Sequence, residues 1–364
     1  MLPRLNVALV YNMKKENADE VSNHPRSGGN GEGGVVVASR TKLQETRPDT
    51  YAEWDSETTI LAVKAALEER HSVTMIEATE YAPQRLLEVQ PDIVFNIAEG
   101  LRGPSREAQI PAVLEMLGIP YTGSDPVTLG ICLDKARAKE ILSFYQIPTP
   151  AFHVIASPEE LERCSVGFPS VVKPLHEGSS KGIVDSSIVR SHSELSEQVR
   201  RVLNDYAEPA LVEKFLPGRE FTVALMGNEP SVQVFPIVEI RLDKLPKSVN
   251  PLYSYEAKWI WDQSDHPIEM YDCPAKIDSD LERRIKETCL NVFRVLRCRD
   301  WTRIDLRLDE KGIPNVLELN PLPGILPNPD DHSCYPMAAR KAGYSYNAML
   351  NAVLDVAIRR NGLG

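Results

Sequence analysis

The sequence predicts an α/β fold made of more than one domain. Three short apolar runs in the first hundred residues, at 5–11, 73–76 and 93–97, alternate with stretches of helical periodicity. Strand–helix–strand alternation is typical of a parallel sheet with helices on its faces. Towards the C-terminus, two runs of alternating polarity flank a short polar turn, which indicates an antiparallel hairpin. A chain of 364 residues has room for two or three domains with ample core.

Composition and charge narrow the class of protein. Hydrophobic residues make up 42% of the chain and charged residues 26%, as in ordinary soluble globular proteins. A net charge of −11 argues against non-specific binding to nucleic acid or to a membrane surface. The first apolar run is too short for a signal peptide or a transmembrane span. The six cysteines form no Cys-x-x-Cys pair and the seven histidines no His-Glu-x-x-His pattern. We therefore expect a reduced, cytoplasmic protein without structural zinc.

Residues 1–128 are predicted to hold the parallel sheet. The first strand is followed by a long, polar, Gly-rich stretch at 12–49. We expect this stretch to be a mobile loop, because so long a connection without structure is usually functional or disordered. Ser56 is a predicted N-cap for a helix over 57–70, whose apolar residues form one stripe.

Residues 129–217 are predicted to form a second α/β domain. A helix over 133–145 leads into Ile147–Pro150, where two prolines within three residues indicate a domain edge. A later strand ends at Lys173 and is followed by a Gly/Ser-rich loop over 177–183. Such a loop can turn backbone N–H groups toward a phosphate, but its spacing is not that of a P-loop. Taken alone, the loop is better explained as an ordinary hairpin turn.

Residues 218–364 are predicted to form a third domain. A strand is expected over 234–240, and the irregular, aromatic-rich stretch at 243–272 is typical of a lid. A helix over 278–296 precedes the hairpin, and a second helix over 346–359 closes the chain.

The hairpin carries side chains that suit a metal ion. If Leu308 pairs with Ile313, Asp305 and Glu318 are diagonal neighbours whose side chains can meet. Asn320 lies on the same face as Glu318. Carboxylate and amide oxygens are ligands that Mg²⁺ prefers. The alternative is a solvated hairpin face with an incidental ion pair, but the rigid, uncharged proline turn that follows favours a site.

With these pieces in order, the chain resembles the ATP-grasp superfamily, and within it the D-alanine–D-alanine ligases. The resemblance runs from about Asp92 to the C-terminus, and the first 90 residues match only loosely. The matching motifs are Leu117–Ser124, Asp134-Lys135, Val172–Pro174, Glu177–Ser180, Val212–Lys214, Arg219–Val223, Tyr255–Lys258, Arg303–Asp305, Leu317–Asn320, Pro323-Gly324 and Pro336–Ala339. The resemblance implies an ATP-grasp fold of three α/β domains, with ATP held between the central and C-terminal domains.

The resemblance also implies a nucleotide site and a metal site. The implied nucleotide-binding residues are Lys135, Lys173, Glu177, Ser180, Glu213, Lys214, Phe215, Leu216 and Glu220. Lys135 and Lys173 would contact the ATP phosphates, and the loop 177–183 would cover these phosphates. The strand 213–216 would meet adenine through its backbone, and Glu220 would bind the ribose hydroxyls. Two Mg²⁺ ions, or Mn²⁺ in their place, would be held by Asp305, Glu318 and Asn320.

The chemistry that the resemblance implies joins a carboxylate to an amine, the two small-molecule partners. The carboxylate would take the γ-phosphoryl group of ATP, and the amine would attack the acyl phosphate through a tetrahedral oxyanion. Arg303 and the backbone N–H of Gly324 would stabilise that oxyanion, with Ser179 and Lys258 completing the catalytic set. The alternatives are a ligase for a different amino acid or natural-product acid, a small-molecule kinase and a non-catalytic nucleotide-binding protein. A homodimer is left open.

The chain departs from the family in the substrate pocket. The family's Gly-Gly-x-Ser-x-Glu stretch is missing, and its nearest match places Glu53 where the family's Glu holds the ammonium group of the first amino acid. The family's His-Gly reads Glu99-Gly100, and its Tyr after Glu-Ala-Lys is Trp259. Ser333 matches the position that would bind the carboxylate of the second substrate. Two interpretations remain: divergence with D-alanine retained, or a first-substrate pocket for a larger or more cationic amine-bearing acid.

Overall fold

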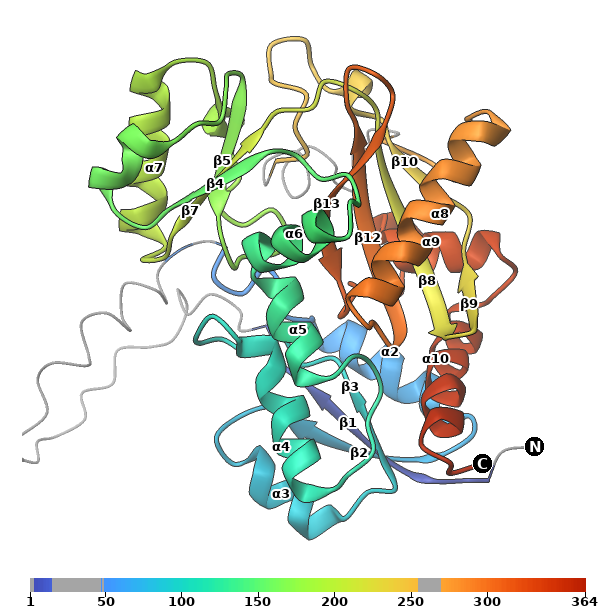
Figure 1. The fold of residues 1–364 in the computed structure, drawn as a ribbon. Coiled ribbons are helices and arrows are strands. Elements are labelled where there is room, and N and C mark those ends of the chain that lie inside the picture. The colour runs from blue at the N-terminus through green and yellow to red at the C-terminus, as the bar shows by residue number, and fades with distance from the viewer. Residues whose placement is uncertain (1–2, 15–46, 48, 255–269) are drawn as a thin grey trace, which may run out of the picture.

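The computed structural model describes residues 3–14, 47, 49–254 and 270–364, which form three sheets with helices packed on them (Figure 1). The strands are β1 (Asn6–Tyr11), β2 (Ser72–Glu77), β3 (Ile93–Asn96), β4 (Phe152–Ile155), β5 (Ser170–Pro174), β6 (Ile188–Val189), β7 (Ala210–Lys214), β8 (Glu220–Asn228), β9 (Ser231–Val234), β10 (Val238–Ile240), β11 (Tyr271–Asp272), β12 (Asp300–Leu308) and β13 (Pro314–Asn320). The α-helices are α2 (Glu57–Glu68), α3 (Ala82–Val89), α4 (Gln109–Leu117), α5 (Pro126–Leu133), α6 (Lys135–Phe144), α7 (His192–Asp205), α8 (Ser279–Val295), α9 (Cys334–Lys341) and α10 (Tyr346–Arg360).

The first sheet is parallel, with strand order β2-β1-β3, as the alternation of strands and helices predicts. The hydroxyl of Ser56 accepts a hydrogen bond from the backbone N–H of Thr59, so the predicted N-cap of α2 is confirmed. The C-terminal helix α10 packs beside α2 and against β8 and β12, so one apolar core joins the first sheet to the last (Figure 1). Helices α4 and α7 match helices that the sequence predicts over 108–117 and 193–203, whereas α3, α5 and α9 have no counterpart among the predicted helices.

The second sheet is antiparallel, with strand order β4-β7-β5-β6, and α7 covers one of its faces (Figure 1). The third sheet has the order β11-β10-β8-β12-β13, and β9 also pairs with β8. Helix α8 packs on one face of this sheet, and α9 and α10 pack on the other. None of the described helices has the length and apolar character needed to cross a bilayer.

The prediction of one continuous strand over 234–240 is wrong, because this stretch belongs to two strands, β9 and β10. Val234 ends β9 and pairs with Leu225, whereas Val238 begins β10 and pairs with Thr222. Pro236 lies between the two strands, and a proline has no N–H to continue a ladder. The chain therefore breaks there while both halves stay on the same neighbour, β8.

The predicted register of the hairpin is also wrong. Leu308 pairs with Pro314 rather than with Ile313, and the register shifts between Asp305 and Leu306. This shift leaves Leu317 as an extra residue, as in a β-bulge. As a result, Asp305 lies directly opposite Glu318 instead of diagonal to it.

Most of the predicted loop 12–49 and the middle of the predicted lid 243–272 lie outside the described residues, and so do Lys258 and Trp259. The domain boundaries at 128 and 217 stay predictions.

Candidate active site

One cavity among the described residues brings together most of the predicted site. Its walls come from the segment before α2, from β5 and the loop after it, from β7 and β8, and from the β12–β13 hairpin and the turn that follows. The predicted site residues that line it are Glu53, Lys173, Glu177, Ser179, Ser180, Glu213, Lys214, Phe215, Leu216, Glu220, Arg303, Asp305, Glu318, Gly324 and Ser333. Lys135, Glu99 and Asn320 are not among the residues that line this cavity.

The hairpin places the predicted metal ligands side by side. Arg303 donates to both oxygens of Asp305, at 3.2 and 2.9 Å, and the Asn320 amide donates to Asp305 Oδ2 at 3.2 Å. Burial raises the pKa of Asp305, Arg303 opposes this, and the negative charge of Glu318 adds to it. Two carboxylates that repel each other beside an amide oxygen are a donor set that fits Mg²⁺.

Lys135, the first residue of α6, lies between the hairpin and the loop over 177–183. Its ammonium group donates to the carbonyl oxygen of Glu177 at 2.5 Å and lies 3.8 Å from Glu318 Oε2. Burial opposes ionisation of Glu318, but Lys135, Lys173 and Arg303 outweigh it and lower the pKa of this carboxyl. The site therefore holds its predicted lysines around an ionised carboxylate.

Glu213 is held between two buried lysines. Its oxygens lie 2.6 Å from Lys173 Nζ and 2.7 Å from Lys139 Nζ. Burial would raise the pKa of Glu213, but the two lysines outweigh it and lower it to about 2. Sequence reasoning missed Lys139, although it lies four residues after Lys135 and thus on the same face of α6. Lys139 also donates to Thr149 Oγ1 and to the carbonyl of Val316.

Glu220, predicted to bind the ribose, also has a cationic partner. Arg307 Nη1 lies 3.2 Å from Glu220 Oε2, and Arg307 Nη2 donates to the carbonyl of Pro251. Burial raises the pKa of Glu220, while Arg307 opposes that change. The carboxylate of Glu220 still borders the cavity, and its ribose contact stays a prediction.

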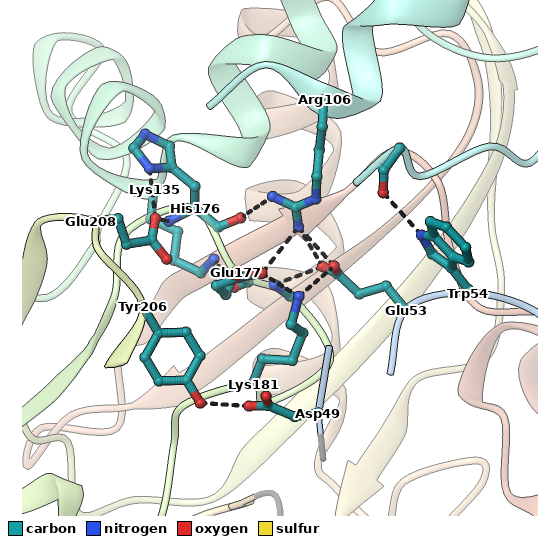
Figure 2. Close-up of polar contacts among 12 residues, drawn as sticks. Asp49, Glu53, Trp54, Arg106, Lys135, His176, Glu177, Lys181, Tyr206 and Glu208 are labelled. Carbon is teal, nitrogen blue, oxygen red and sulfur yellow. Dashed lines mark hydrogen bonds and ion pairs between the residues drawn. The ribbon is translucent and has the colours of Figure 1, made fainter. Parts of the chain in front are cut away.

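A cluster of buried charges joins the N-terminal part of the chain to the loop over 177–183 (Figure 2). Arg106 Nη2 donates to both oxygens of Glu53, at 2.7 and 2.8 Å. Lys181 lies 3.2 Å from Glu53 Oε2 and 2.5 Å from Glu177 Oε2. Arg106 also donates to the carbonyl of His176 at 2.8 Å. The sequence reasoning did not find Arg106 and Lys181, because their partners lie far away in the chain.

Two serines of the site, Ser180 and Ser333, donate to backbone carbonyls. Ser179 and Ser180 both have positive φ, at 49° and 60°, a conformation that costs a non-glycine residue energy and that clusters at functional sites. Ser180 Oγ donates to the carbonyl of Tyr253, and Ser333 Oγ donates to the carbonyl of Gly324 at 2.9 Å. The predicted contact of Ser333 with a substrate carboxylate stays a prediction.

Glu99 follows β3 and is half-buried. Burial raises the pKa of its carboxyl well above the usual range, and Glu107 and Glu53 add to this by repulsion. These surroundings therefore disfavour the ionised form of Glu99, and a cation bound beside it would favour that form.

The whole fold is similar to solved structures of ligases. The crystal structure of D-alanine–D-alanine ligase from Bacillus anthracis complexed with ATP matches with a TM-score of 0.67 and 22% identity, covering 99% of this chain and 100% of that chain. The VanG D-Ala:D-Ser ligase from Enterococcus faecalis matches with a TM-score of 0.66 and 19% identity, covering 97% and 99%. The fold is therefore that of the ATP-grasp enzymes, as the motifs predict.

The sequence comparisons identify the family. The family model described as D-ala D-ala ligase C-terminus matches residues 142–355. The D-alanine–D-alanine ligase of Alcanivorax borkumensis is 36% identical over 269 residues, which are 74% of this chain and 78% of that protein. The uncharacterized protein y4sG of Sinorhizobium fredii is 41% identical over 268 residues, 74% and 75% of the two chains. The chain belongs to the D-alanine–D-alanine ligase family, and the predicted class of enzyme, an ATP-dependent ligase, is confirmed.

Proposed function

We propose that the protein joins the carboxylate of one amino acid to the amine of another through an acyl phosphate, with ATP as the phosphoryl donor. One observation carries this proposal. The paired carboxylates Asp305 and Glu318 and the cations Lys173 and Arg303 all border one cavity, next to the turn at Gly324. The names of the relatives supply the first substrate to test, D-alanine.

The cations of the site offset charge in the phosphoryl transfer. Both the attacking carboxylate and ATP are anionic, so their approach needs positive charge nearby. Lys173 borders the cavity and Lys135 lies beside Glu318, so both ammonium groups can lie close to phosphate oxygens. Mg²⁺, held by Asp305, Glu318 and Asn320, would neutralise further phosphate charge when bound.

Arg303 and Gly324 act in the second step. The attack of the amine places a negative charge on the former carbonyl oxygen, and the guanidinium of Arg303 and the N–H of Gly324 are the donors for it. Ser333 donates to the carbonyl of Gly324 at 2.9 Å, which holds this turn in place. Removing one such donor typically lowers the rate by about 10²–10³-fold.

The test is a product analysis with the full-length protein. The protein is incubated with ATP, Mg²⁺ and pairs from a panel of D- and L-amino acids, and the products are weighed by mass spectrometry. We expect a dipeptide, ADP and phosphate, with steady ADP release only when an amine substrate is present. Arg303→Gln should lose this activity, whereas Arg70→Gln, at an exposed ion pair with Asp355, should keep it. A phosphorylated acid that accumulates without an amine would identify a kinase instead.

The residue type at Glu99 bears on the identity of the first substrate. Because this carboxylate replaces the family's His, we propose that the pocket takes an amine-bearing acid that is larger or more cationic than D-alanine. This predicts weak D-alanyl-D-alanine formation and a better substrate elsewhere in the panel. Glu99→Gln should weaken binding of the first substrate far more than binding of ATP. Efficient, saturable D-alanyl-D-alanine synthesis by the unmodified protein would contradict the proposal.

A further inference from the structure

The carboxylate of Glu53 has no acceptor site left for a substrate. Oε1 accepts from Arg106 at 2.7 Å and from the backbone N–H of Gly178 at 2.8 Å. Oε2 accepts from Arg106 at 2.8 Å and from Lys181 at 3.2 Å. An ionised carboxylate offers about four lone-pair sites, so these contacts fill it.

The contacts of Glu53 bind one part of the molecule to another (Figure 2). Two of its donors, Gly178 and Lys181, belong to the loop over 177–183, while Glu53 itself precedes α2 in the N-terminal part. Burial opposes ionisation of Glu53, but Arg106 and Lys181 outweigh it and hold the pKa of this carboxyl at about 2. Glu53 therefore stays charged and bound to the loop at any ordinary pH.

Asp55, two residues further on, differs from Glu53 in that its carboxylate has acceptor sites left for a ligand. It borders the same cavity, and its side chain forms no hydrogen bond or ion pair with any residue that the structure describes. Its backbone is fixed at the carboxyl end of β1, because Asp55 N donates to the carbonyl of Asn12 and Lys14 N donates to the carbonyl of Asp55.

Asp55 and Glu99 lie at the same edge of the parallel sheet. Glu99 comes shortly after β3, the neighbour of β1. Hydrogen bonds from Gly100 N to Asn12 Oδ1 and from Trp54 Nε1 to the carbonyl of Gly100 fix the two segments to each other. In open parallel sheets, ligands bind outside the carboxyl ends of the strands.

The surroundings of Asp55 leave its negative charge uncompensated. Burial alone raises the pKa of Asp55 to about 7. Asp55 in turn adds to the repulsion that raises the pKa of Glu99. A cation placed between the two carboxylates would lower both pKa values and relieve this repulsion. The cationic part of an amino acid at neutral pH is its ammonium group.

We propose that Asp55, and not Glu53, is the carboxylate that binds the ammonium group of the first substrate, with Glu99 as its neighbour. Glu53 is instead a positioning residue that holds the loop over 177–183 against the N-terminal part. The proposal rests on the proposed function, in that the first substrate is an amine-bearing acid. It names a different residue for its recognition.

The experiment compares Asp55→Asn with Glu53→Gln in the full-length protein. Binding of a panel of amino acids, which includes D-alanine and diamino acids, is measured by calorimetry with Mg²⁺ and a non-hydrolysable ATP analogue. Asp55→Asn should weaken binding of the best ligand at least about tenfold, because a charge-assisted contact is lost. It should leave the affinity for the nucleotide and hydrogen exchange of 177–183 unchanged. Glu53→Gln should speed hydrogen exchange of 177–183 and should weaken amino-acid binding less than Asp55→Asn does.

Two controls separate recognition of the amine from a general loss of structure. The same acid without its amino group should bind wild type and Asp55→Asn equally, and Asp55→Glu should recover part of the affinity for the amine. Asp92→Asn is the matched variant, because Asp92 accepts from Asn6 N at the opposite end of the same sheet. It should bind every ligand as wild type does.

The result that overturns the proposal is loss of amino-acid binding in Glu53→Gln with normal binding in Asp55→Asn. A wild-type protein that binds no amine-bearing acid overturns it as well. Since binding is measured without turnover, Asp55-dependent binding with no ligation product would contradict the proposed function alone. Ligation with unchanged binding in Asp55→Asn would contradict only this inference.

Discussion

Replacing Glu213 by Gln should destabilise the protein more than replacing either of its partners. The change removes the nearest counter-charge of two buried ammonium groups, since the side chains of Lys139 and Lys173 are only 2% and 7% exposed. Removing one partner of a buried ion pair costs about 3–5 kcal/mol. Because two ion pairs share Glu213, we expect the free energy of unfolding to fall by about 5 kcal/mol, the upper end of that range. Lys139→Met keeps the Glu213–Lys173 pair and should cost about 3 kcal/mol or less.

The assay is urea unfolding of the wild type and both variants, followed by circular dichroism and tryptophan fluorescence. The pH dependence gives a second test. The pKa of Glu213 is lowered from 4.5 to about 2 in the folded state. The ionised Glu213 therefore contributes to the free energy of unfolding above about pH 4.5, and this contribution is lost as the pH falls toward 2. The difference in unfolding free energy between wild type and Glu213→Gln should shrink on acidification. A Glu213→Gln variant no less stable than Lys139→Met would refute this reasoning.

Three further predictions follow from the site. Turnover should need Mg²⁺ or Mn²⁺ and no zinc, and Glu318→Gln should abolish it with an unchanged circular dichroism spectrum; near-wild-type turnover would rule out the metal assignment. Burial lowers the pKa of His176, but hydrogen bonds and attraction from Asp134 and Glu208 outweigh burial and raise this pKa to about 9. The stabilising charge of His176 is fully present below about pH 6.5 and is lost as the pH rises through 9, so the stability difference between wild type and His176→Gln should narrow over that window. In Gly178→Ala the new Cβ would lie 2.5 Å from Glu53 Oε1, so hydrogen exchange of 177–183 should quicken, whereas Gly167→Ala, with nothing within 4 Å, should leave it unchanged.

The elements with local signals were predictable from the sequence. Ser56 caps α2 because a hydroxyl there can reach the N–H of Thr59, a contact three residues long. The parallel sheet follows from apolar runs that alternate with helical stretches, and the hairpin follows from two runs of period-two alternation around a polar turn. Most of the predicted nucleotide and metal residues line one cavity, and their binding roles stay predictions.

The register of the hairpin depends on contacts that no local pattern contains. Asp309 Oδ1 accepts from Lys311 N and Ile313 N, and this turn brings Pro314 opposite Leu308. The bulge next to Val316 coincides with contacts from another segment, since Val316 N donates to the carbonyl of Pro148. Such tertiary contacts decide where the extra residue goes.

Charged partners were missed for a similar reason. Glu53 is 53 residues from Arg106 and 128 residues from Lys181 in the chain. A sequence pattern within one helix or strand cannot pair them. Sequence reasoning therefore placed Glu53 by resemblance to the family, whereas its cationic partners Arg106 and Lys181 lie outside the motifs that carry the resemblance.

Transfer of a carboxylate oxygen to phosphate tests the central claim most directly. The first substrate is labelled with ¹⁸O in its carboxylate, and the phosphate released during ligation is analysed by mass spectrometry. An acyl-phosphate mechanism breaks the bond between the acyl carbon and the bridging oxygen, so each phosphate should carry one ¹⁸O atom and the ADP none. Release of unlabelled phosphate together with a ligated product would contradict the account.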